Sequence, residues 1–334
     1  MTLLSEVLIT TTRRELKEPF STALRTVSIF EVVQCEVRTD DGRIGRGECV
    51  ATPAITGDTL VAILEDLRGP ITDFLLHQTY STYAEIAPYL SEISATASAR
   101  AAADMALYDL EFPFASLNFR VATDVTLPLA DVTAIPALVL SRIIAGFKVF
   151  KVKLANEPIA DSLSKLQKVR EIAGEGSLLR VDPNQSWSLH HTLKFLERVA
   201  KENILIEFLE QPTIAADKVA LANIRRNSDI AVMADESCFS MSDLLELIDL
   251  QAVDLVNIKL LKSGSLYKSF EMAEVALAAG IRVLMGSMME GDLGVANAAR
   301  LAHAIAPEAV HDLDAAWWAR VSSIDYVEGE LVYR

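Results

Sequence analysis

The sequence predicts a (β/α)8 barrel that follows a smaller α+β capping domain. First, from about Val121 onward, short apolar strands alternate with helix-period segments at intervals of roughly 25 residues. Second, the residues before that point contain two strand-rich segments and then a run of helical segments. Third, no glycine-rich phosphate loop follows the first barrel strand, which disfavours a doubly wound sheet. We therefore expect a capping domain over 1–120, a barrel over 121–315, and a C-terminal segment, 316–334, that returns to the capping domain.

The capping domain is expected to be an antiparallel sheet with helices packed on it. Strand patterns cover 7–16 and 28–50, and Asp41-Gly42 within the second segment suits a hairpin turn. Three helix-period segments follow, at 59–76, 82–93 and 98–110.

Eight barrel strands are expected, at 124–130, 147–153, 178–182, 205–210, 230–235, 254–260, 281–286 and 309–314. Clear helical patterns lie between several of them, at 162–174, 191–202, 240–250 and 266–280. In such a barrel the chemistry takes place at the C-terminal ends of the strands.

Composition excludes several classes of partner. The chain has 334 residues and a formal net charge of -15, which opposes binding to nucleic acid or to an anionic membrane surface. No apolar run reaches the roughly 20 residues that span a bilayer, and we expect a cytoplasmic protein. Cys35, Cys49 and Cys238 are an odd number without metal-ligand spacing, so we expect reduced, buried thiols.

Lysines stand at the ends of two predicted barrel strands. Lys151 and Lys153 are two residues apart on an extended chain, so both side chains point to the same side, and Lys259 ends the sixth strand. Two neighbouring ammonium groups lower each other's pKa toward the range where an amine acts as a base. Lys148 and Lys262 are expected to face solvent.

Carboxylates end three successive strands: Asp182 the third, Glu210 the fourth and Asp235 the fifth. Any one of them alone could cap the next helix or bond a turn. Together, without histidine or cysteine nearby, they form a hard oxygen site that favours Mg²⁺ over zinc or copper.

The order KVK, VDPNQSW, EFLEQP, ADES, NIKLLKSG and MGSMMEGDLG resembles the enolase superfamily, and within it the muconate-lactonizing subgroup. The resemblance implies that Asp182, Glu210 and Asp235 bind Mg²⁺. It implies that Lys153 and Lys259 are the two acid/base groups, that Lys151 assists them, and that Ser287 contacts the substrate. The seventh strand has no histidine, so the mandelate-racemase subgroup is rejected.

Two further segments bear on the substrate. HDLDAAWW places Asp312 and Asp314 on one side of the eighth strand, where a carboxylate pair suits an ammonium group, and it resembles the feature by which dipeptide epimerases hold the substrate's amino group. PFSTALRTV, 19–27, resembles the specificity loop of epimerases acting on Ala-Glu, with Arg25 facing the distal carboxylate. A second loop, 51–58, would close over the site. The alternatives are a helix cap plus a surface acid for the two aspartates, and a surface salt bridge for Arg25.

The expected activity is an Mg²⁺-dependent 1,1-proton transfer at the α-carbon of a dipeptide's C-terminal residue, leading to L-Ala-D/L-Glu from peptidoglycan fragments. One alternative is o-succinylbenzoate synthase or another lyase or cycloisomerase of the subgroup, which does not require an ammonium-binding acid pair. An alternative of another class is a non-catalytic, metal-dependent peptide-binding barrel. The expected partner is a small dipeptide, and a homo-oligomer is left open.

Overall fold

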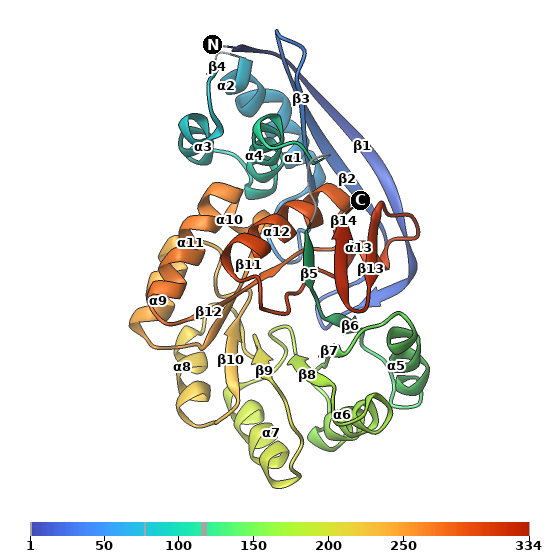
Figure 1. Cartoon of the computed structure of the whole chain (residues 1–334). Helices are drawn as coiled ribbons and strands as arrows, with labels where there is room; N and C mark the ends of the chain where they lie inside the picture. Colours follow the sequence, from blue (N-terminus) through green and yellow to red (C-terminus); the bar gives the residue numbers. More distant parts are fainter. Residues whose placement is uncertain (1, 77, 115–118, 334) are drawn as a thin grey trace.

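The structure is a computed structural model that describes residues 2–76, 78–114 and 119–333. In Figure 1 the capping domain lies above the barrel, and the long β1 and β2 ribbon runs down one side of the molecule toward the barrel. The predicted fold class is confirmed.

The capping domain contains an antiparallel sheet in the order β3-β2-β1-β4, with β1 at Thr2–Ser21, β2 at Thr26–Thr39, β3 at Ile44–Val50 and β4 at Thr79–Tyr80. The predicted hairpin joins β2 to β3, and Gly42 adopts the positive φ of +88° that this turn needs. The helical part comprises α1 (Leu60–Asp66), η1 (Leu67–Ile71), α2 (Thr72–Leu76), α3 (Tyr83–Ser91) and α4 (Ala97–Glu111). Gly69 and Pro70 interrupt the first helical segment.

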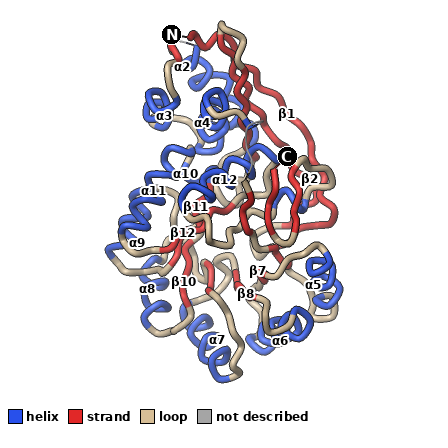
Figure 2. Tube along the Cα trace, in the orientation of Figure 1, coloured by secondary structure: helices blue, strands red, loops and turns tan. Residues whose placement is uncertain are grey.

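Within the described chain, the barrel sheet is parallel and has the order β12-β11-β10-β9-β8-β7-β6. Its strands are β6 (Val125–Leu127), β7 (Val149–Lys153), β8 (Leu178–Asp182), β9 (Phe208–Glu210), β10 (Ala231–Ala234), β11 (Leu255–Lys259) and β12 (Arg282–Gly286). Figure 2 shows most of the helices outside these strands. The helices are α5 (Ile135–Ile144), α6 (Ile159–Ala173), α7 (Leu189–Lys201), α8 (Lys218–Arg226), α9 (Met241–Asp249), α10 (Leu260–Ser263), α11 (Leu266–Ala278), α12 (Asp292–Ile305) and α13 (Ala315–Trp318).

The predicted eighth strand, 309–314, forms two isolated parallel bridges instead of a regular ladder. His311 bridges to Thr123, which precedes β6, and Asp312 bridges to Gly286 at the end of β12. These two bridges join the first and last strands of the sheet. A side chain replaces one backbone partner here, because the Thr123 hydroxyl accepts the Leu313 N–H at 2.8 Å.

Two buried side chains reinforce this closure. The Arg180 guanidinium on β8 donates to Asp124 at 2.7 Å and to the Val310 carbonyl at 2.8 Å. The His311 Nδ1 accepts the Met285 N–H at 3.0 Å, while Nε2 lies 3.0 Å from the Ala306 carbonyl. Since one ring nitrogen accepts and the other donates, the fold uses the neutral imidazole.

The C-terminal residues contact both parts of the molecule. β13 (Ile324–Val327) and β14 (Glu330–Tyr333) form a hairpin, and β14 pairs with β5 (Arg120–Ala122). Just before the hairpin, Ala319 bridges to Leu16 of β1. The boundaries at residues 120 and 315 remain a prediction.

A buried carboxylate also joins cap to barrel. Glu48 on β3 accepts the Gly294 N–H at 3.0 Å, at the start of α12. A Cβ on Gly291 would lie 2.4 Å from a Glu48 oxygen, so a glycine is required there for this approach.

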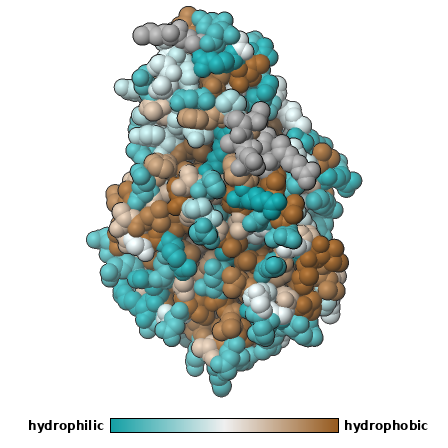
Figure 3. Space-filling view, viewed as in Figure 1, coloured by the Kyte–Doolittle hydropathy of each residue, from teal (hydrophilic) through white to brown (hydrophobic). Residues whose placement is uncertain are grey.

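The buried thiols match the expectation. All three cysteines are free and buried. Across the described residues, no helix combines the length and apolar character needed to cross a membrane. Figure 3 shows an apolar patch where α5 lies in Figure 1, and α5 exposes Leu140 and Ile144. Assembly into a homo-oligomer remains a prediction.

We predict that acid weakens the barrel closure through His311. Burial lowers the pKa of this imidazole from 6.5 to about 4. Between these values the unfolded chain binds the proton more readily, so this contribution to stability is present above pH 6.5 and is lost as the pH falls toward 4. The loss amounts to about 3 kcal/mol.

His311→Asn keeps an acceptor but cannot take up this proton. Urea unfolding at several pH values should therefore show the wild type losing more stability than the variant between pH 6.5 and 4. Parallel pH curves for the two proteins would contradict the assignment.

Candidate active site

A cavity opens at the C-terminal end of the barrel strands, beneath the cap loop between β1 and β2. Eight of the ten predicted site residues line it: Arg25, Lys151, Lys153, Asp235, Lys259, Ser287, Asp312 and Asp314. The other two, Asp182 and Glu210, lie against the lysines of this cavity. The structure therefore brings the whole predicted set together.

Lys151 lies at the centre of the site. Its Nζ is 2.6 Å from Glu210 Oε2, 2.8 Å from Asp312 Oδ2 and 3.3 Å from Asp182 Oδ2. These contacts join β7 to β8, β9 and the segment at the eighth strand position. All four side chains are buried, so the charges compensate each other within the protein.

Lys153 and Lys259 approach the cavity from different strands, β7 and β11. The Lys153 Nζ donates to Asp182 at 2.5 Å, and the Lys259 Nζ donates to Asp235 at 2.8 Å. Gly286 at the end of β12 leaves room for the second lysine, because a Cβ there would lie 2.8 Å from Lys259 Cε. Two amines thus reach one cavity from separate strands.

The predicted mutual lowering of lysine pKa values is wrong for Lys151. Burial lowers its pKa, but Asp312, Glu210 and Asp182 outweigh that effect and hold the pKa well above the ordinary value. Burial likewise lowers the pKa of Lys259, and Asp235 and Asp312 raise it by more. The surrounding acids, which the strand pattern alone did not place, decide the direction.

Lys262 was predicted to face solvent, and this is wrong. It is buried, and its Nζ donates to Asp235 Oδ1 at 2.6 Å, to the Asp235 carbonyl at 2.6 Å and to the Asn257 carbonyl at 2.8 Å. It comes from α10, a short helix that directly follows β11 and turns the side chain inward. Asp235 therefore lies between two ammonium groups, which hold its pKa well below the usual range against the effect of burial.

Sequence reasoning also missed three amide side chains. Asn257 on β11 donates to Glu210 at 3.0 Å and to Asp312 at 2.9 Å. The Gln211 Oε1 accepts the Asp235 N–H at 3.0 Å and thereby fixes the loop after β10. The Asn184 side-chain amide donates to Asp182 Oδ2 at 3.3 Å, and its backbone N–H donates to Asp182 Oδ1 at 2.8 Å. The sequence did offer a signal for Asn257. It is a polar residue in an apolar strand, two positions before Lys259, so its side chain lies on the same side of the strand as that of Lys259.

Non-glycine residues adopt positive φ angles beside these carboxylates. Asn184 has φ 44°, Gln185 has φ 65° and Gln211 has φ 33°. Such strained backbone concentrates at functional sites, where the surroundings hold it in place.

Asp312 and Asp314 both line the cavity but differ in their surroundings. Burial raises the pKa of Asp312, but Lys151 and Lys259 outweigh this and hold it below the usual range. Asp314 accepts the Thr126 N–H at 2.7 Å and the Trp318 indole N–H at 2.9 Å, both on Oδ2. Burial and the charge of Asp312 raise the pKa of Asp314.

Arg25 lies on the cap loop and is half-buried. Its backbone carbonyl accepts the Thr22 N–H at 2.9 Å, which closes the loop. Among the described residues its guanidinium has no carboxylate partner, although it lines the cavity. Ser287 follows β12, and its backbone N–H donates to the Asp312 carbonyl at 3.0 Å.

The chemistry of the donors fits a hard cation. Asp182, Glu210 and Asp235 supply oxygen at three adjacent strand ends. Two further buried oxygens, Glu236 Oε2 and Asn184 Oδ1, have no hydrogen-bond partner among the described residues. As the described side chains stand, no three acidic or soft ligands converge on one point, because lysine ammonium groups contact these carboxylates. A cation at this position would replace those ammonium contacts.

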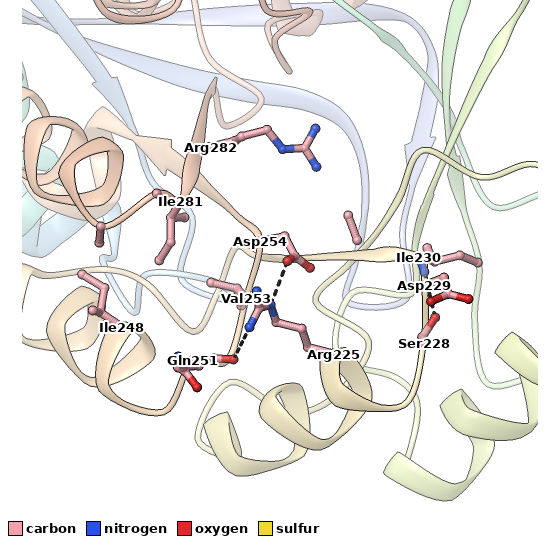
Figure 4. Close-up of a pocket in the computed structure, with 13 residues that line it drawn as sticks. Arg225, Ser228, Asp229, Ile230, Ile248, Gln251, Val253, Asp254, Ile281 and Arg282 are labelled. Carbon is pink, nitrogen blue, oxygen red and sulfur yellow. Dashed lines mark hydrogen bonds and ion pairs between the residues drawn. The ribbon is translucent and has the colours of Figure 1, made fainter.

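A second hollow lies at the opposite end of the barrel, where β10, β11 and β12 begin (Figure 4). Arg225 there donates to Asp254 at 2.7 Å and to the Gln251 carbonyl at 3.1 Å. Among its described lining residues are none of the ten predicted site residues. Because barrel enzymes react at the other end, this hollow is not the candidate active site.

A parallel sheet closed into a barrel, with lysines from two strands beside strand-end carboxylates and a cap loop above them, is typical of a class of barrel enzymes that transfer protons. The chain matches the family model "Enolase C-terminal domain-like" over 134–334 and "Mandelate racemase / muconate lactonizing enzyme, N-terminal domain" over 4–115. It belongs to this family of the enolase superfamily, as the resemblance implied.

Two curated relatives show the range of activities nearby. The chain is 32% identical over 303 residues to L-Ala-D/L-Glu epimerase from Clostridium acetobutylicum, covering 86% of this chain and 83% of the relative. It is 32% identical over 293 residues to N-succinyl-L-Arg/Lys racemase from Bacillus cereus, covering 84% and 79%. The predicted class of enzyme, an isomerase, is confirmed.

Two solved structures match closely. One is a substrate-liganded complex of the L-Ala-D/L-Glu epimerase from Bacillus subtilis, with TM-score 0.93, 27% identity and coverage of 99% of this chain and 96% of that one. The other is a dipeptide epimerase from Enterococcus faecalis complexed with Mg and L-Leu-L-Tyr, with TM-score 0.91, 28% identity and coverage of 100% and 98%.

We predict that Lys262 stabilises the fold through Asp235. Lys262→Met keeps the apolar stem but removes a charged donor from the buried Asp235 carboxylate and from two backbone carbonyls, so unfolding in urea should show a loss of about 2–4 kcal/mol. The matched control is Lys148→Met, at an exposed position, which should change stability by less than about 0.5 kcal/mol. Equal effects of the two substitutions would contradict the role of Lys262.

Proposed function

We propose that this protein is an Mg²⁺-dependent dipeptide epimerase that inverts the α-carbon of the C-terminal residue, with L-Ala-D/L-Glu as the leading substrate. The single observation that supports this choice of substrate is the arrangement of charged side chains in the cavity. Arg25, a guanidinium without an acidic partner among the described residues, lines the same cavity as Asp312 and Asp314. A dipeptide with a free amino group and an acidic side chain has the complementary charges.

The reacting groups are the two lysines. Lys153 from β7 and Lys259 from β11 would contact opposite faces of the α-carbon: one removes the proton, and the other returns a proton to the opposite face. Asp182, Glu210 and Asp235 would hold Mg²⁺, which would supply positive charge to the substrate carboxylate as negative charge develops there. Lys151 would assist from its place among the carboxylates.

The remaining walls favour a small apolar residue at the N-terminal position. The apolar side chains among the lining residues are Phe20, Leu24, Ile55, Met288, Met289 and Ala315. They can exclude water from the α-carbon and contact a methyl group. An L-alanyl residue suits these walls, and such dipeptides occur in peptidoglycan fragments.

Two other reactions remain candidates within the family. An N-succinyl-L-Arg/Lys racemase is one of the relatives, and its substrate would have to place a carboxylate on Arg25 and a cation on the two aspartates. An o-succinylbenzoate synthase would use the same lysines but would leave Asp312 and Asp314 without an ammonium group. The non-catalytic alternative is disfavoured, because binding alone does not require a base from each of two strands.

A dipeptide library in D₂O with Mg²⁺ tests the proposal. Incorporation of α-deuterium, read by mass spectrometry, should be fastest for Ala-Glu and should stop when excess chelator is added. N-succinyl-Arg and the succinylbenzoate precursor belong in the same screen. Faster turnover of either one than of any dipeptide would overturn the proposal.

We predict that Arg25→Ala raises KM for Ala-Glu strongly while neutral dipeptides change much less. A buried charge that loses its partner costs roughly 3–5 kcal/mol, so the preference for Glu should fall at least about tenfold even in a partly wet site. Arg13→Ala, at an exposed position on β1, is the matched control. An unchanged preference for Ala-Glu would remove Arg25 from the site.

A further inference from the structure

Trp318 is a buried side chain in contact with a substrate-binding candidate. It lies at the end of α13, one helical turn after Asp314, and its side chain has no exposed surface. The indole N–H donates to Asp314 Oδ2 at 2.9 Å, and the Thr126 N–H donates to the same oxygen at 2.7 Å. These two donors fix the orientation of a carboxylate that lines the cavity.

The same ring contacts the strand that leads into the cap loop. Phe20, near the end of β1, packs edge-to-face on Trp318, with ring centroids 4.9 Å apart and an interplanar angle of 84°. Phe20 lines the cavity together with Thr22, Leu24 and Arg25, which follow it on the loop. The contact between Phe20 and Trp318 thus helps to position the loop that carries Arg25.

A buried cation holds the ring from another side. The Arg142 guanidinium of α5 lies 4.9 Å from the Trp318 ring and 4.8 Å from the Trp317 ring, and it donates to Glu18 of β1. This contact joins barrel helix, C-terminal segment and cap strand around the two tryptophans. Trp318 is therefore held by Phe20 on one side and by Arg142 on another.

We infer that Trp318 is a positioning residue shared by the two ends of the substrate site. Through its N–H it orients Asp314 toward the substrate's ammonium group, and through its ring it sets the cap loop that presents Arg25 to the side-chain carboxylate. This inference rests on the proposed function and adds to it a residue that does not touch the substrate. It also separates the two roles, since one belongs to the N–H and the other to the ring.

Three compounds resolve the two roles by α-proton exchange in D₂O. L-Ala-L-Glu carries both charges, N-propionyl-L-Glu lacks the ammonium group, and L-Ala-L-Gln lacks the side-chain charge. The amino ratio is kcat/KM for L-Ala-L-Glu divided by that for N-propionyl-L-Glu. The side-chain ratio is kcat/KM for L-Ala-L-Glu divided by kcat/KM for L-Ala-L-Gln.

Trp318→Phe keeps a ring against Phe20 but removes the N–H. It should lower the amino ratio about tenfold, since a hydrogen bond to a charged group is lost, and leave the side-chain ratio within about twofold. Phe20→Leu should do the reverse, lowering the side-chain ratio about three- to tenfold through the lost ring contact. Trp317→Phe, which keeps a ring beside Arg142, is the matched control and should change neither ratio.

A double variant excludes a merely structural effect. In an Asp314→Asn background, Trp318→Phe should lower the amino ratio no further, because both substitutions act on one carboxylate. The inference is overturned if Trp318→Phe leaves the amino ratio unchanged, if it lowers both ratios equally, or if Trp317→Phe has the same effect. A wild-type amino ratio near one would overturn the ammonium site of the proposed function and this inference together, whereas a high wild-type ratio that no variant changes would overturn only the inference.

Discussion

The site depends on the ammonium group of Lys151, which lies among three buried carboxylates. Its contacts with Asp182, Glu210 and Asp312 span 2.6 to 3.3 Å and link neighbouring strands of the barrel. Acids packed this closely would repel one another without a cation between them, and burial would then favour their protonated forms. Lysines from β7, β11 and α10 are interleaved with the strand-end carboxylates and compensate their charge.

The charge cluster faces a cavity that is lined by both charged and apolar side chains. The cap loop supplies Arg25 and apolar side chains, and the eighth strand position supplies two aspartates. Closure of the barrel is what places those aspartates, and it relies on Arg180 and on a neutral His311 as much as on strand pairing. The segment that closes the barrel therefore also carries the two aspartates that line the cavity.

Much of the fold and most of the site could be predicted from the sequence. Strands and helices alternate with clear periods, and charged residues at the ends of apolar strands stand out, as with Asp182, Glu210 and Lys259. Arg25 could be named only through the resemblance to a known loop, because nothing in its own surroundings distinguishes it from a surface arginine. Lys262 was misassigned because a helix of four residues after β11, which no pattern of that length reveals, turns its side chain inward. The directions of the lysine pKa shifts depend on neighbours distant in sequence, so they required the tertiary structure.

The most direct test of the central claim, one base for each face of the α-carbon, is stereospecific proton exchange by lysine variants. Lys153→Ala and Lys259→Ala would each be incubated in D₂O with L-Ala-L-Glu and, separately, with L-Ala-D-Glu, and α-deuterium would be measured in each dipeptide. The account predicts that both variants lose net epimerisation, that one still exchanges the α-proton of only the L,L dipeptide, and that the other exchanges only that of the L,D dipeptide. Exchange of the same epimer by both variants, or dehydration of the succinylbenzoate precursor by a wild type that exchanges neither dipeptide, would contradict it.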